Sequence, residues 1–98
     1  MKRANWIEKK SGYIEVRNVF KDEFNRLIKL ESTQRQELIK LQVLLEMYLR
    51  FDEKDKALDI DKKIKDLENT IVETQKEKEY ADIHLEWLET VIKENGYE

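Results

Sequence analysis

Hydrophobic residues recur at alternating intervals of three and four positions along most of the chain. One such seam consists of Phe20, Phe24, Leu27, Glu31, Gln34, Leu38, Leu41, Leu45 and Tyr48. A second consists of Ala57, Ile60, Ile64, Leu67, Ile71, Thr74, Lys78, Ala81, Leu85, Leu88 and Ile92. This spacing keeps side chains on one face of an α-helix and is typical of helices that pack as a coiled coil. The pattern therefore predicts two helical arms, over residues 19–51 and 56–95.

The two seams are mirror images about the polar segment 52–55, which has the composition of a tight turn. If the chain folds back there, Tyr48 lies opposite Ala57, and at the far end Phe20 lies opposite Leu85. We therefore expect an all-α fold and a single domain over residues 1–98: a long antiparallel helical hairpin that resembles a coiled coil. Asp52 or Asp55 is expected to cap the second arm, since a short carboxylate accepts hydrogen bonds from free amides of a first turn.

The middle of the first arm is polar from Glu31 to Glu37, and Thr33 with Gln36 fits a capping box that would begin a new helix. We prefer a continuous helix because the seam keeps its phase and no glycine or proline intervenes. A break near Ser32 and Thr33 is the alternative.

Four polar residues occupy seam positions that face each other across the hairpin: Glu31, Gln34, Thr74 and Lys78. We expect Glu31 to pair with Lys78, and the layer to fix the register of the two arms at some cost in stability. The alternative interpretation is a binding or switching site.

Residues 1–18 form the least regular segment. The stretch from Tyr13 to Arg17 alternates weakly and follows Gly12, which favours an extended segment or a small β-hairpin with Trp6 and Ile7. A short helix before Gly12 is the competing interpretation.

Hydrophobic residues outside the seams form two further stripes. Near the turn these are Ile39, Val43, Leu44, Met47 and Phe51. Near the end of the second arm they are Tyr80, Ile83, Trp87 and Val91, with His84 beside them. Such stripes are typical of a core or an oligomer interface. We expect the first to mediate self-association into a helical bundle, and the second to be covered by Trp6 and Tyr13 of the N-terminal segment or by a protein partner.

Composition narrows the functional classes. Charged residues make up 42% of the chain, there is no proline or cysteine, and glycine occurs twice, which argues against folds with many turns. No apolar run exceeds three residues, so no membrane-spanning helix is expected. The basic start lacks an apolar stretch behind it, so a cytoplasmic location is expected. Lysine outnumbers arginine 14 to 5, a bias typical of AT-rich coding in some bacteria and their phages.

No catalytic, cofactor or metal site is predicted. His84 is the only histidine, and no second ligand shares its helix face at the required spacing. The acidic run from Asp52 to Asp61 lacks the glycine and terminal glutamate of a calcium loop. We therefore expect a protein without enzymatic activity.

The charge is unevenly distributed. Residues 1–21 contain six basic and two acidic residues, whereas residues 66–98 contain three basic and ten acidic residues. The N-terminal basic residues are Lys2, Arg3, Lys9, Lys10 and Arg17, and with the aromatic residues among them they give a possible nucleic-acid arm. The acidic pI of about 5.3 argues against it. The sequence thus favours a small interaction protein, an adaptor, assembly factor or inhibitor of bacterial or phage origin, that binds itself and a protein partner; a nucleic-acid-associated protein is the alternative.

Overall fold

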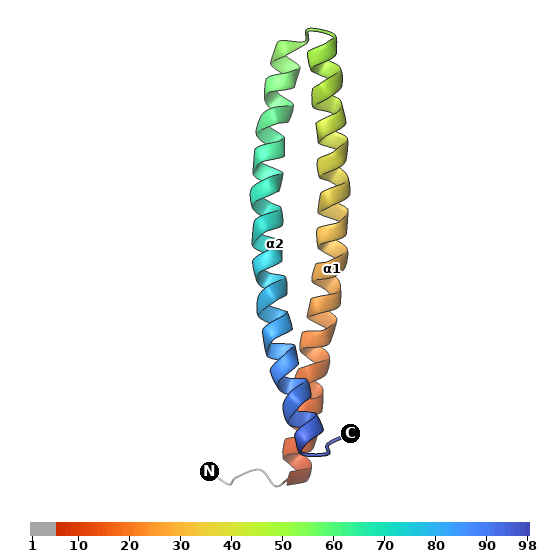
Figure 1. Ribbon diagram of the computed structural model, residues 1–98, viewed down its shortest axis with the longest axis vertical. Helices are drawn as coiled ribbons and strands as arrows, with labels where there is room; N and C mark the ends of the chain where they lie inside the picture. The colour runs from red at the N-terminus through yellow and green to blue at the C-terminus, as the bar shows by residue number, and fades with distance from the viewer. Residues whose placement is uncertain (1–5) are drawn as a thin grey trace.

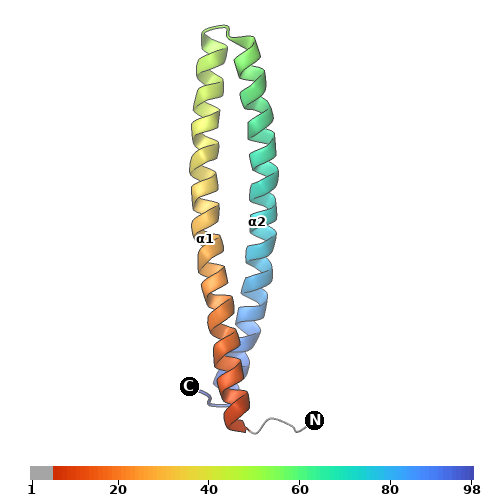
Figure 2. The same ribbon diagram turned by 180° about the vertical axis from the view of Figure 1, so that it is seen from behind.

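The computed structural model describes the backbone of residues 6–98 and the side chains of residues 8–98. Two long helices account for this range: α1, Trp6–Arg50, and α2, Lys54–Glu94 (Figure 1). They run antiparallel and lie side by side from the turn to the opposite, open end, where α1 begins and α2 ends (Figure 2). The described residues contain no strand. The predicted all-α helical hairpin is therefore confirmed.

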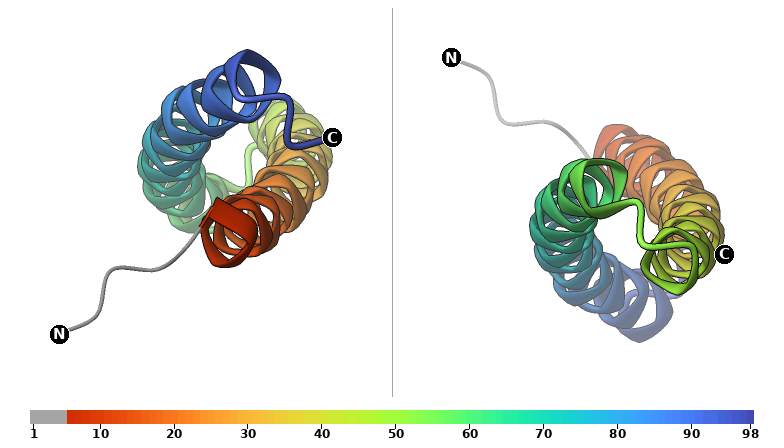
Figure 3. Two further views of the ribbon diagram at one scale, coloured as in Figure 1. Left: turned by 90° about the horizontal axis from the view of Figure 1, so that it is seen from below. Right: turned by 90° about the horizontal axis from the view of Figure 1, so that it is seen from above.

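The molecule is a rod of 69 × 26 × 14 Å. Its long dimension agrees with that of α1, since 45 residues at 1.5 Å each span about 68 Å. Seen along this axis, the two helices wind around each other (Figure 3). A seven-residue hydrophobic repeat requires such winding, because a straight α-helix would turn the seam away from its partner.

The core of the hairpin is formed by the two predicted seams. Its buried hydrophobic residues are Leu27, Leu41, Ala57, Ile60, Ile64, Ile71, Ala81, Leu85, Leu88 and Ile92, and every one of them is a seam position. The other seam residues are buried or half-buried. Near the turn, Leu41, Ile60 and Ile64 form a cluster against which Leu38 and Tyr48 also pack. The periodicity of the sequence is therefore the periodicity of the core.

Helix α1 passes without a break through its polar middle. The hydroxyl of Thr33 donates a hydrogen bond to the carbonyl of Lys29, 3.1 Å away and one turn earlier in the same helix. The Thr33 hydroxyl thus bonds to the backbone of the helix that contains it, and it does not cap the start of a new helix. The continuous arm is confirmed, and no helix begins at Ser32 or Thr33.

The turn is tighter than predicted and is capped differently. It consists of residues 51–53, and α2 begins at Lys54. The amide of Glu53 donates to the carbonyl of Tyr48 at 2.8 Å, and the amide of Asp52 donates to that of Leu49 at 3.3 Å, which closes α1 with a Schellman motif. Asp52 has the left-handed backbone that this motif requires, with φ of 54°.

The prediction that Asp52 or Asp55 caps α2 is wrong. Asp52 is part of the end of α1, and Asp55 already lies in the first turn of α2. The N-cap is Glu53, whose side chain makes no capping hydrogen bond, while its carbonyl accepts one from the amide of Ala57 at 3.0 Å.

The prediction of an extended or hairpin-like segment over residues 1–18 is wrong for residues 6–18, which belong to α1. The seam continues in phase to Arg17 and Tyr13, which are half-buried at the open end. Packing these side chains offsets the cost of about 1 kcal/mol that Gly12 imposes inside a helix. Residues 1–5 lie outside the described residues.

Candidate interaction surfaces

Four exposed hydrophobic residues form a row that follows the last turns of α1 and ends in the turn, which we call the turn-end ridge: Ile39, Val43, Met47 and Phe51. Their exposed fractions lie between 41% and 71%. Each residue follows the last by four positions, so the row runs obliquely around the helix and does not follow the seam. The ridge therefore presents an apolar surface that α2 leaves uncovered.

Leu44 does not belong to this ridge, although the sequence grouped it there. It is half-buried and packs against the cluster of Leu41, Ile60 and Ile64. Two other leucines near the turn, Leu49 and Leu58, are 60% and 70% exposed, and sequence analysis did not single them out. The only feature of the sequence that marks these two leucines as exposed is that both fall outside the seams.

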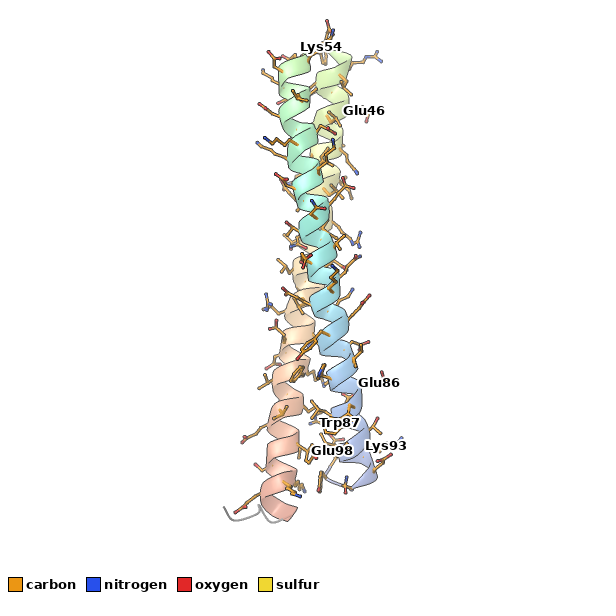
Figure 4. All side chains as sticks on the ribbon, turned by 90° about the vertical axis from the view of Figure 1, so that its left-hand side faces the viewer. Glu46, Lys54, Glu86, Trp87, Lys93 and Glu98 are labelled. Atoms are coloured by element: carbon orange, nitrogen blue, oxygen red, sulfur yellow. The ribbon has the colours of Figure 1, made fainter. Side chains whose placement is uncertain are left out.

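A second apolar surface lies at the open end, where α1 and α2 both contribute. We call it the open-end surface and define it by Val16, Val19, Tyr80, Ile83 and Trp87, which are all exposed. The three residues from α2 are 60%, 64% and 58% exposed, respectively. Trp87 lies near the open end of the rod (Figure 4). Sequence analysis found the α2 half but assigned Val16 to the segment that would cover it, and it missed Val19.

The expected cover of this surface is not present among residues 8–98. Residues 8–17 are helical and cannot fold back over α2, so they reach only its edge: the rings of Tyr13 and Trp87 lie 6.0 Å apart. Val91 is half-buried. The side chain of Trp6, predicted to dock here too, lies outside the described side chains.

Aromatic side chains line the border between the two helices. The ring of His84 stacks on Phe20, with centroids 5.6 Å apart, and lies 4.1 Å from Tyr80. Its Nδ1 is 2.7 Å from the carbonyl oxygen of Tyr80. Beside these rings, Tyr13, Val16 and Trp87 border a hollow of about 440 Å³ with mostly apolar walls. Val16 and Trp87 of the open-end surface therefore border a shallow groove between the two helices, a shape that amphipathic helices bind.

The predicted polar layer is assembled in the middle of the seam. Lys78 Nζ donates a hydrogen bond to Glu31 Oε2 at 3.0 Å, and Arg35 lies 3.6 Å from the other carboxylate oxygen. The hydrogen bond from Lys78 lowers the pKa of Glu31 below its ordinary value, while burial opposes this shift. Thr74 is buried and donates to the carbonyl of Thr70 in its own helix. The carboxamide oxygen of Gln34 is buried without a hydrogen-bond partner.

The end of the chain folds back onto α1. Gly96 adopts a left-handed φ of 63°, and the amide of Tyr97 donates to the carbonyl of Ile92 at 3.0 Å, which makes a second Schellman motif. The ring of Tyr97 then lies 5.8 Å from that of Tyr13, and the carboxylate of Glu98 accepts a hydrogen bond from Arg17. We call residues 95–98 the C-terminal clasp.

Three residues of the possible nucleic-acid arm have described side chains: Lys9, Lys10 and Arg17. Arg17 is engaged by Glu98 and its side chain is only 18% exposed, while Lys10 is half-buried and Lys9 is exposed. Lys2 and Arg3 lie outside the described residues. The uneven charge of the sequence thus has one explanation within the chain, since a basic residue of α1 meets an acidic residue of the clasp.

Within residues 6–98, no helix is long and apolar enough to cross a membrane. The same part of the chain holds no group of three or more His, Cys, Asp or Glu side chains placed to bind a metal ion. The geometry thus offers two apolar surfaces, one polar layer and one clasp.

Comparison of the chain with protein-family models, curated proteins and solved structures finds no match.

Proposed function

We propose that this protein is a non-enzymatic interaction module that self-associates and binds a helical segment of a protein partner. The turn-end ridge is the proposed self-association surface, and the open-end surface is the proposed partner site. An adaptor, assembly factor or inhibitor works in this way, because its task is to hold or block another protein.

The amount of exposed surface carries this proposal. A compact protein of 11.9 kDa exposes about 5,900 Å² by the usual scaling of surface with mass. This chain exposes 7945 Å², or about 2,000 Å² more. A standard protein–protein interface buries about 800 Å² on each partner. The excess is therefore somewhat larger than the area of about 1,600 Å² that two such interfaces would cover.

The excess is also of the right chemical kind. Thirteen large hydrophobic residues are exposed among the described side chains, against eight large buried ones. A two-helix hairpin has a single seam, which supplies little core for a chain of this length. Contiguous exposed apolar patches on a monomer mark sites of interaction.

The direction of the turn-end ridge favours a second copy as its occupant. A row with steps of four residues fits into the equivalent row of an identical helix when the two helices cross at about −50°. Such a contact repeats the same surface on both copies around a two-fold axis. It also spans only a few turns, as the ridge does from Ile39 to Phe51.

Sedimentation velocity or light scattering tests the proposal. The chain should form a dimer or larger assembly at micromolar concentration, and Val43→Glu with Met47→Glu should shift it toward monomer, because each change buries an unpaired charge. Ser32→Glu with Gln36→Glu is the control, with the same added charge, the same spacing and two exposed polar positions. A monomeric parent protein at tens of micromolar would refute self-association.

A further inference from the structure

The flank of the hairpin beside the C-terminal clasp holds a cavity that the proposed interaction surfaces do not use. It measures about 600 Å³ and lies between the first third of α1 and the end of α2. Its charged walls are formed by Arg17, Lys21, Glu89, Lys93 and Glu98, and Gly96 lies at its edge. Three of these side chains are cationic and two are anionic, and one of the anions, Glu98, belongs to the clasp.

Arg17 occupies an unusual position for a cation. It takes a seam position, where its side chain is only 18% exposed. One Nη donates to Glu98, the other donates to Asn18 at 3.4 Å, and Nε is buried without a hydrogen-bond partner. A guanidinium presents its donors as a planar fork that matches an anion with two oxygens. The single contact with Glu98 therefore leaves part of this fork unused.

Glu98 is a readily displaced occupant. Its side chain is 64% exposed, and it is held at the end of a short segment that follows the turn at Gly96. Ion pairs with such an exposed partner contribute little to stability. Without the Glu98 carboxylate, the charged walls of the cavity would be three cations and Glu89.

We propose that Arg17, Lys21 and Lys93 form an oxyanion-binding site, and that Glu98 occupies it as an intramolecular substitute for the ligand. The ligand chemistry is a carboxylate or phosphate group, bound by the Arg17 fork with the two lysines adding positive charge. Binding would release Glu98 and, with it, the contact of Tyr97 with Tyr13. This inference does not depend on self-association.

The test uses the full chain labelled with ¹⁵N, and it follows the Arg17 Nε–H resonance during titration with inorganic phosphate at constant ionic strength. Glu98→Gln should bind phosphate about two- to five-fold more tightly than the parent, because the competing carboxylate is removed. Glu46→Gln is the matched control: it makes the same charge change at an exposed site near the turn, far from the cavity (Figure 4). It should leave the phosphate affinity unchanged.

A second pair of variants separates the fork from simple charge. In the Glu98→Gln background, Arg17→Lys keeps the charge but removes the fork, and it should weaken phosphate binding several-fold. Because this variant lacks the Arg17 Nε–H, both proteins of the pair are followed by the backbone amide resonance of Lys93, which lines the cavity. Circular dichroism shows whether each variant keeps its helices. Repeating the titration with glutarate, a carboxylate, shows which of the two oxyanions the site prefers. Saturation by either anion supports the site. Equal phosphate affinities for Glu98→Gln and Glu46→Gln, or no saturable shift with either anion, would overturn the proposal.

Discussion

Lys78 Nζ lies 3.0 Å from Glu31 Oε2, and this ion pair joins α1 to α2 across residues that are 47 positions apart in the sequence. Glu31 is the less exposed partner, with 13% of its side chain accessible against 29% for Lys78. The pair lies in the seam, so a shift of one helix that separated the two side chains would leave each charge in the seam without the other. We infer that the polar layer opposes such shifts, since an unpaired charge in a seam is costly.

The first prediction concerns the pH dependence of stability. Because the hydrogen bond from Lys78 lowers the pKa of Glu31 in the folded protein, the ionised carboxylate stabilises the fold above its unfolded pKa. This stabilisation should be lost as the pH falls through the lowered folded value. Urea denaturation should therefore show Glu31→Gln less stable than the parent at pH 7, with the difference shrinking toward pH 3. Glu68→Gln, at an exposed position of α2, should differ little from the parent at either pH.

The second prediction concerns topology in solution. Leu45 and Ile60 are opposite each other in the mirrored seams, and the chain has no cysteine of its own. Leu45→Cys with Ile60→Cys should form a disulfide within one chain, seen by mass spectrometry and non-reducing electrophoresis. Leu45→Cys with Ile71→Cys, about three turns further from the fold-back point, should not. Disulfides found only between chains would argue for an extended helix that pairs with another copy.

The third prediction uses the two glycines as opposite probes of the backbone. Gly12 lies inside α1, where an added Cβ would meet nothing within 4 Å. Gly12→Ala should therefore raise the free energy of unfolding by up to about 1 kcal/mol through helix propensity. Gly96 has a left-handed backbone, so Gly96→Ala should lower it by about 1 kcal/mol. If Gly12→Ala destabilised the protein, α1 would not extend through this segment.

The fourth prediction compares two neighbours on α1. Leu27 is 1% exposed and lies in the seam, whereas Ile28 is 44% exposed. Leu27→Ala should lower the free energy of unfolding by about 3 kcal/mol, since it leaves a cavity, while Ile28→Ala should cost less than about 1 kcal/mol. Thermal or urea denaturation of both variants measures the difference. Equal costs would mean that the seam is not the core.

Sequence periodicity predicted the core because burial on one helix face leaves a direct trace in residue spacing. The seams gave the pairing of α1 with α2 and brought Glu31 to Lys78. The same rule applied to Tyr13 and Arg17 would have extended α1, but Gly12 and the β-branched residues after it are read locally as signs of an extended chain. Tertiary packing overrides such weak local preferences.

The caps and the clasp were harder to predict because they depend on backbone direction. A Schellman motif needs one left-handed residue, which glycine adopts easily and aspartate tolerates. Gly96 near the end of α2 was the available signal for the second motif, while Asp52 looked like a helix start. The contact of Glu98 with Arg17 follows only from the direction in which the second motif sends the chain.

The mirrored pairing of the two helices also sets the order in which the hairpin closes. Tyr48 and Ala57 are close in sequence, whereas Phe20 and Leu85 are separated by most of the chain, and the entropic cost of joining two positions grows with the loop between them. Contacts next to the turn should form first, and pairing should spread outward like a zipper. Amide hydrogen exchange should then be slowest near Leu41 and Ile64 and fastest at the open end. Any molecule bound at the open end would therefore stabilise the part of the hairpin in which the two helices separate first.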